Sequence, residues 1–182
     1  DRGPGRPPAA RDTVAGCSPT MIRLRETIEV ARPIDEVFGY VSNFGNAAQW
    51  DPGVAESRKA STGPIGVGTA FKLRVRFGPR SIPMEYAIRE FDRPRRVLLE
   101  GKSDSVHALD DIGFAATPRG TRITYTADIS LLGAFGIVEP LLKGVLDGVG
   151  KKAVGGLHAA LSEEPAAPER SRLADLQDHL IV

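Results

Sequence analysis

The sequence predicts an α+β fold in which an antiparallel sheet of about seven strands packs against one long C-terminal helix. Two observations lead to this prediction. Six stretches between residues 54 and 131 have the composition and alternation of strands, with turn residues between them. After them, apolar residues at helical spacing run from about residue 136 to residue 161. A helix of this length, roughly 38 Å at 1.5 Å per residue, needs a whole sheet to cover its apolar side.

The first strand is predicted over residues 22–30, where apolar residues alternate with charged ones. After it, Pro33 stands at a first helical position and acidic residues follow in the first turn, which predicts a helix ending near Asn43. The irregular segment 45–52 (GNAAQWDP) contains Trp50, the single tryptophan of the chain. We expect two short helices between the first strand and the second.

Six further strands are predicted to follow one another without an intervening helix. Their alternation gives each strand one dry face and one wet face, as in an antiparallel sheet packed on one side. Gly and Pro mark the turns, as in residues 63–68 (GPIGVG) and 118–120 (PRG). The predicted strands are 54–61, 69–77, 82–91, 95–103, 105–116 and 121–131.

Both ends of the chain differ from this pattern. Residues 1–20 are rich in Pro, Gly and Arg without periodicity, which predicts a disordered lead-in before a domain over residues 21–162. Residues 163–182 begin as a proline-broken acidic linker and end in a short amphipathic tail. That tail either docks on the domain or a partner, or is frayed.

Composition excludes several classes of function. The chain has 182 residues with 24 Lys and Arg against 23 Asp and Glu, so its net charge of +1 favours neither nucleic acid nor an anionic membrane as partner. Cys17 is the only cysteine and the three histidines are scattered, so we expect no disulfide, metal site or cofactor. Without an apolar run of about 18 residues or a signal-peptide core, we expect a soluble, cytoplasmic protein with no transmembrane segment.

Three motifs resemble the START-like (SRPBCC) superfamily, particularly its polyketide cyclase/dehydrase branch. They are Pro33 to Phe38 (PIDEVF) in the first helix, Trp50 followed by residues 52–54 (PGV), and residues 120–124 (GTRIT) at the start of the last strand. The resemblance covers about residues 22–161. It implies a helix-grip fold, in which the sheet is strongly curved and wraps around the long C-terminal helix.

A curved sheet cannot close tightly on a straight helix, so the resemblance also implies a cavity between them for a small hydrophobic ligand. The two short helices and the loop 63–68 would surround its mouth. The residues expected to line the cavity are Trp50, Phe71, Leu73, Val75, Tyr86, Leu99, Asp110, Ile112, Tyr125, Leu142, Leu146 and Val149.

Asp110 and Tyr125 are the candidate catalytic residues. Alternation along residues 106–114 places Asp110 on the inward side among apolar neighbours, where a carboxyl either finds a partner, such as an inward tyrosine, or its pKa rises. A bulge at Asp110–Asp111 would exchange the two aspartates. Glu26, inward on the first strand, has the same two interpretations. Ser105, His107 and Asp111 face away from the core, too far apart along the strand for a catalytic triad.

Three functions are compatible with these features. The first is binding of a small lipid-like, aromatic or polyketide-like molecule in the cavity, which requires only the apolar lining. The second is a cyclase or dehydratase, with Asp110 transferring a proton and Tyr125 polarising a carbonyl. The third is a protein-interaction module that uses the tail 171–182. The sequence leaves the oligomeric state open between monomer and homodimer.

Overall fold

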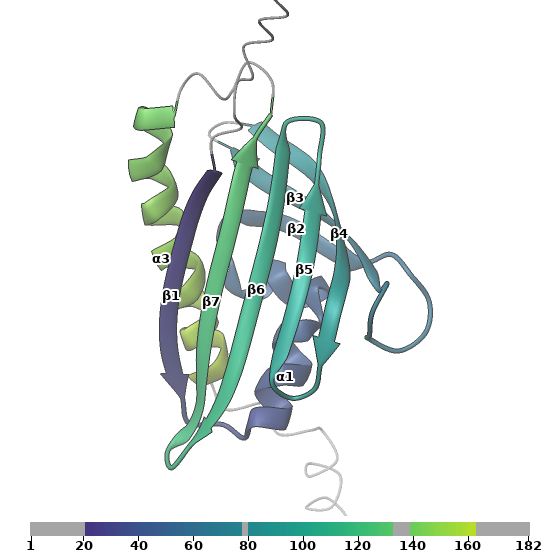
Figure 1. Cartoon of the computed structure of the whole chain (residues 1–182), viewed down its shortest axis with the longest axis vertical. Coiled ribbons are helices and arrows are strands. Elements are labelled where there is room, and N and C mark those ends of the chain that lie inside the picture. The colour runs from purple at the N-terminus through teal and green to yellow at the C-terminus, as the bar shows by residue number, and fades with distance from the viewer. Residues whose placement is uncertain (1–20, 78–79, 133–138, 163–182) are drawn as a thin grey trace, which may run out of the picture.

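The computed structural model describes residues 21–77, 80–132 and 139–162. In this part of the chain, seven strands form one antiparallel sheet in the order β1-β7-β6-β5-β4-β3-β2. The sheet is strongly curved, so that β2 and β3 pass behind β5 and β6 in Figure 1. The strands are β1 (Met21–Val30), β2 (Val54–Lys59), β3 (Ala70–Phe77), β4 (Arg80–Asp92), β5 (Arg96–Lys102), β6 (Val106–Thr117) and β7 (Gly120–Leu131).

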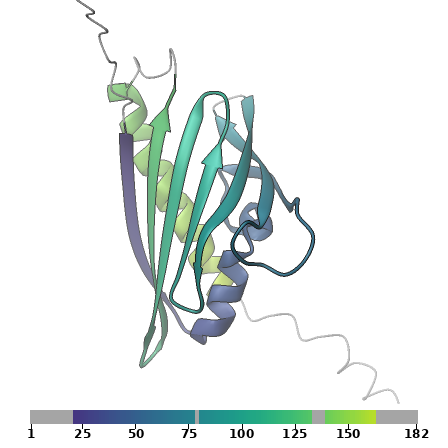
Figure 2. The ribbon, with the colours of Figure 1, turned by 45° about the vertical axis from the view of Figure 1, so that its right-hand side comes forward.

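The helices occupy the inner side of this sheet. The long helix α3 (Glu139–Ser162) runs diagonally behind β1 and β7 in Figures 1 and 2. The segment between β1 and β2 contains α1 (Ile34–Ser42), the 3₁₀ turn η1 (Phe44–Asn46) and α2 (Ala47–Trp50). The predicted helix-grip fold, with a curved sheet around a C-terminal helix and two short helices after the first strand, is confirmed.

Some expectations fall on residues that the structure does not describe. The predicted lead-in 1–20 and tail 163–182 lie outside the described residues. The same holds for the side chains of Leu142, Leu146 and Val149, although their backbone belongs to α3. In the described part of the chain, no helix combines the length and the hydropathy that crossing a membrane requires.

Two β-bulges interrupt the strict alternation of inward and outward side chains. One lies in β2 between Val54 and Glu56, and the other in β4 between Ile88 and Glu90. A bulge adds one residue to one strand, which shifts the phase of alternation and bends the sheet. After the second bulge, Phe91 therefore packs against the core, with its ring centroid 5.1 Å from that of Phe38.

An apolar core fills the space between the inner face of the sheet and the helices. Phe38 of α1 is fully buried and packs edge to face on Phe91 of β4 and Phe114 of β6, with centroid distances of 5.1 and 5.2 Å. Burial of one such side chain stabilises a fold by about 2–3 kcal/mol. This cluster attaches α1 to two strands of the sheet.

Two glycines of α3 allow the helix to approach its neighbours closely. A Cβ added at Gly150 would lie 3.3 Å from Cδ1 of Leu24 in β1. A Cβ added at Gly156 would overlap the main-chain carbonyl oxygen of Trp50 at the end of α2. The helix therefore lies against β1 on one side and against α2 on the other.

Substitution of Gly156 tests the contact between α3 and α2. Because the obstacle is backbone, we expect Gly156→Ala to lower the free energy of unfolding by about 1–3 kcal/mol, measured by urea denaturation. Gly155→Ala is the matched control, since a Cβ at Gly155 meets no atom within 4 Å. That variant should gain up to about 1 kcal/mol from helix propensity. Equal effects of the two substitutions would refute the tight contact.

Candidate functional site: a buried carboxyl on the inner face of the sheet

Asp110 lies at the centre of the inner face, in the middle of β6. It pairs with Leu99 of β5 on one side and with Ala127 of β7 on the other, in a register that is regular along β6. The bulge that would have exchanged Asp110 with Asp111 is therefore absent, and the prediction that Asp110 faces inward is confirmed. Asp110 is only 5% exposed.

The Asp110 carboxyl has one partnered and one unpartnered oxygen. The Tyr125 hydroxyl donates a hydrogen bond of 2.9 Å to Oδ1, and Oδ2 has no hydrogen-bond partner. Burial raises the pKa of Asp110 to about 7, although the hydroxyls of Tyr125 and Tyr86 oppose this increase. Asp110 therefore exists in both protonation states near neutral pH, as a group that accepts and returns protons must.

Tyr86 reaches this carboxyl because a glycine lies opposite it. Tyr86 of β4 pairs with Gly101 of β5, and a Cβ added at Gly101 would overlap the Tyr86 ring. The ring therefore occupies the space that a side chain at residue 101 would fill. Burial, followed by the neighbouring Asp110, raises the pKa of both Tyr86 and Tyr125, so both phenols stay protonated at neutral pH.

Trp50, at the end of α2, packs against Tyr125, the hydrogen-bond partner of Asp110. It is 3% exposed, and its ring packs edge to face on Tyr125 with a centroid distance of 6.3 Å. A second edge contact, at 6.0 Å, joins it to Phe44 of η1. Its indole Nε1 has no hydrogen-bond partner. Trp50 is thus a core anchor of the α2 segment whose single polar atom is unsatisfied.

Two further carboxyls lie close to this cluster. Burial raises the pKa of Asp51, whose Oδ1 accepts a 2.7 Å hydrogen bond from the Gly53 amide, and its charge raises the pKa of Asp110. Glu26 of β1 pairs directly with Tyr125 of β7 and is half-buried. The inward position of Glu26 was predicted, whereas the proximity of Asp51 was not, because residues 51–53 follow no strand or helix period.

The other predicted cavity residues fall into three groups. Phe71, Leu73, Tyr86, Leu99 and Ile112 are buried on the inner face, and Val75 on the same face is half-buried. Trp50, Asp110 and Tyr125 form the polar cluster described above. Leu142, Leu146 and Val149 have side chains outside the described residues. Whether these residues contact a ligand stays a prediction.

The outer face has ion pairs in place of a catalytic triad. His107 Nε2 lies 2.8 Å from Glu100 Oε1 on β5, and Asp111 forms an ion pair of 2.7 Å with Arg96. The exclusion of a Ser105, His107 and Asp111 triad is consistent with these partners. Among the residues that the structure describes, no group of three or more His, Cys, Asp or Glu side chains is placed to hold a metal ion.

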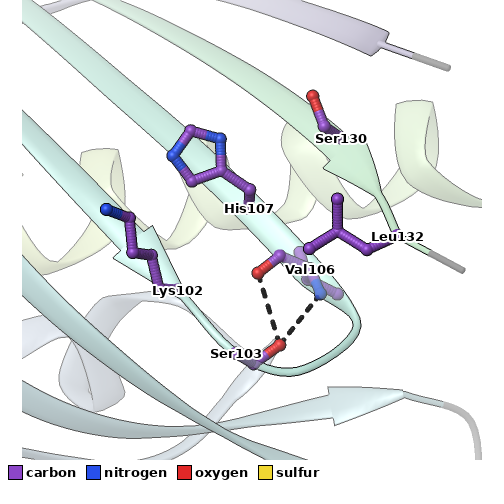
Figure 3. A pocket seen from close by; sticks show the side chains of 6 residues that line it. All are labelled: Lys102, Ser103, Val106, His107, Ser130 and Leu132. Carbon is purple, nitrogen blue, oxygen red and sulfur yellow. Dashed lines mark hydrogen bonds between the residues drawn. The ribbon is translucent and has the colours of Figure 1, made fainter. Parts of the chain in front are cut away.

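A pocket of about 300 Å³ lies at the end of the outer face, where β5, β6 and β7 meet (Figure 3). Lys102 and His107 share one carboxylate, since Lys102 Nζ is 2.9 Å from Glu100 Oε1, the atom that also contacts His107. Hydrogen bonds from Lys102 first and His107 second hold the pKa of Glu100 at about 2. The pocket is lined by Lys102, Ser103, Val106, His107, Ser130 and Leu132.

With this geometry in view, the chain can be compared with known proteins. The model of a family described as polyketide cyclase / dehydrase and lipid transport matches residues 21–162. The chain belongs to this family, and so to the START-like superfamily that its motifs resemble. No protein with a curated description matches the sequence significantly.

Several solved structures have the same fold. A START superfamily protein from Mycobacterium smegmatis is 14% identical, with a TM-score of 0.64 over 76% of this chain and 96% of that one. The ZhuI aromatase/cyclase from Streptomyces sp. R1128 is 14% identical, with a TM-score of 0.64 over 78% of this chain and 94% of that one. A protein from Thermus thermophilus is 13% identical, with a TM-score of 0.64 over 78% and 97% of the two chains.

The raised pKa of Asp110 predicts an unusual dependence of stability on pH. Its ordinary pKa is 3.8 and its folded value is about 7, so between these values the folded protein binds more protons than the unfolded chain. The free energy of unfolding should therefore decrease as the pH rises through this interval, by up to about 4 kcal/mol in total from this group.

Asp110→Asn keeps an acceptor for Tyr125 but cannot ionise. Urea denaturation between about pH 4.5 and pH 8 should show that the variant gains stability relative to the wild type as the pH rises. Asp111→Asn, one residue along β6 but on the outer face, is the control and should show no such gain. Parallel pH profiles for the wild type and Asp110→Asn would contradict the raised pKa.

Proposed function

We propose that this protein binds a small, mostly apolar molecule between the inner face of the sheet and α3. The observation that supports this best is Oδ2 of Asp110, a buried polar atom that accepts no hydrogen bond although the Tyr86 hydroxyl lies close enough to lower the pKa of this carboxyl. A buried polar atom without a partner costs folding free energy, so its persistence is explained if a ligand supplies the partner. Membership of a family described by polyketide cyclisation, dehydration and lipid transport is consistent with this function.

Two of the side chains next to Asp110 are small, which supports placing such a molecule there. Ala108 precedes it on the inner face of β6 and Ala127 is its partner on β7. The space over Gly101, which pairs with Ala108 on β5, is occupied by the Tyr86 ring. The contacts of α3 with β1 and α2 lie to either side of this area, since Leu24 is the partner of Ala127 and Trp50 packs on Tyr125.

The test is native mass spectrometry of the purified full-length chain. We expect one apolar molecule per chain to co-purify with the wild type. Ala127→Leu fills the space beside Asp110 and should lose this molecule, whereas Thr126→Leu, its neighbour on the outer face of β7, should retain it. Circular dichroism checks that both variants fold. An empty wild type that no lipid or aromatic compound stabilises would refute the proposal.

A second candidate function, catalysis by a cyclase or dehydratase, is favoured by the pairing of Asp110 with Tyr125. A carboxyl with a pKa of about 7 abstracts and returns protons efficiently at neutral pH. The phenol that donates to its Oδ1 is protonated, and in this function its single O–H turns from Oδ1 to the ligand carbonyl and polarises it. In this function Asp110 transfers the proton and Tyr125 orients the carbonyl of a polyketide chain.

Two conservative substitutions test this second function. With a polyketide that has adjacent β-carbonyl groups as substrate, Asp110→Asn and Tyr125→Phe should each lower kcat by about 10²-fold or more while binding is retained. Tyr40→Phe is the control, because the Tyr40 hydroxyl donates to the side chain of Gln49, which is exposed and lies outside the Asp110 cluster. Unchanged turnover in both variants would remove the catalytic role and leave binding as the function.

A further inference from the structure

The inner face has both a donor and an acceptor without partners. In the described part of the chain, three buried side-chain polar atoms have no hydrogen-bond partner: Asn43 Oδ1, Trp50 Nε1 and Asp110 Oδ2. The first lies beside Gly45, where α1 ends. The other two belong to residues that are 3% and 5% exposed, and both face the interior. One is an N–H donor and the other is a carboxyl oxygen.

Tyr125 connects these two atoms. Its ring contacts the Trp50 ring edge to face at 6.3 Å, and its hydroxyl donates to the other oxygen of the Asp110 carboxyl at 2.9 Å. The Tyr125 hydroxyl is thereby committed to Oδ1. Trp50 and Asp110 therefore both contact the same tyrosine, and a ligand beside Tyr125 would lie next to the side chains that carry the two unpartnered atoms.

The charges around this position are acidic. Besides burial, the largest effects on the pKa of Asp110 come from the phenols of Tyr125 and Tyr86 and the carboxyls of Asp51 and Asp128. Glu26 from β1 lies beside Tyr125 on the same face. On α3, Lys151, Lys152 and His158 have exposed side chains. An anionic ligand group would therefore meet repulsion from these carboxyls.

We propose that the interior site selects neutral apolar molecules that bear a hydroxyl, and that it discriminates against carboxylates such as free fatty acids. The ligand hydroxyl donates to Asp110 Oδ2. An oxygen of the ligand, either that of the same hydroxyl or that of an adjacent carbonyl, accepts from Trp50 Nε1. This inference rests on the proposed function, because it specifies the chemistry of the molecule that the site binds.

The experiment compares matched probes at pH 8. The first set is 2-naphthol, 2-methylnaphthalene and 2-naphthoate, and the second is 1-dodecanol and dodecanoate, each titrated against the full-length chain by displacement of the fluorescent probe N-phenyl-1-naphthylamine. We expect the hydroxyl compound to bind at least tenfold more tightly than its methyl or carboxylate counterpart, because only the hydroxyl satisfies both buried atoms without adding negative charge.

Two substitutions test whether the preference for hydroxyl compounds depends on Trp50 Nε1 and Asp110 Oδ2. Trp50→Phe keeps the aromatic ring but removes the N–H, so the affinity for 2-naphthol should fall about tenfold while that for 2-methylnaphthalene is unchanged. Asp110→Asn removes the charge, so the discrimination against 2-naphthoate should diminish. Asp111→Asn, which alters a carboxyl on the outer face, should change neither preference.

The outcomes separate this inference from the proposed function. Equal affinity for the hydroxyl, methyl and carboxylate probes overturns the inference and leaves the proposed function standing. If no probe binds, the molecule that co-purifies with the chain decides, since a neutral hydroxyl compound supports the inference and a carboxylate or a pure hydrocarbon overturns it. If no probe binds and no molecule co-purifies, the proposed function fails and the inference fails with it.

Discussion

The close contact between Gly156 of α3 and the carbonyl of Trp50 positions the inner face of this protein. Because no side chain intervenes, the long helix lies directly on α2, and the Trp50 indole is directed toward Tyr125 in β7. Tyr125 in turn donates to Asp110 in β6. A backbone contact of α3 thus lies next to the residue whose ring packs on the tyrosine bonded to Asp110.

Much of the fold could be predicted from local patterns. The alternation of apolar residues predicted each strand to within a few residues, because one face of every strand is buried. The same alternation placed Asp110 on the inner face, and an inward tyrosine was correctly considered as its partner. The bulges at residues 54–56 and 88–90 were not predicted, since a bulge depends on two strands at once and leaves no period in either.

The polar cluster was predicted only in part, because its arrangement depends on side chains from distant elements. Gly101 was a usable signal, since glycine inside a strand often marks a close approach, and here it accommodates the Tyr86 ring. Asp51 left no signal, because its position follows from an irregular segment. The unsatisfied Trp50 Nε1 is equally invisible in sequence, where a tryptophan predicts burial but not the absence of a partner for its N–H.

The open edges of the sheet also bear on how the chain avoids aggregation. A seven-stranded sheet that ends in β1 and β2 presents two rows of backbone hydrogen-bonding groups to which another chain could add a strand. The edge at β2 is only six residues long, is interrupted by a bulge, and is bound to the η1–α2 segment through the Ser57 hydroxyl. On β1, Arg23, Arg25 and Glu29 point outward. The curved sheet is thus protected at both margins against pairing with a neighbour.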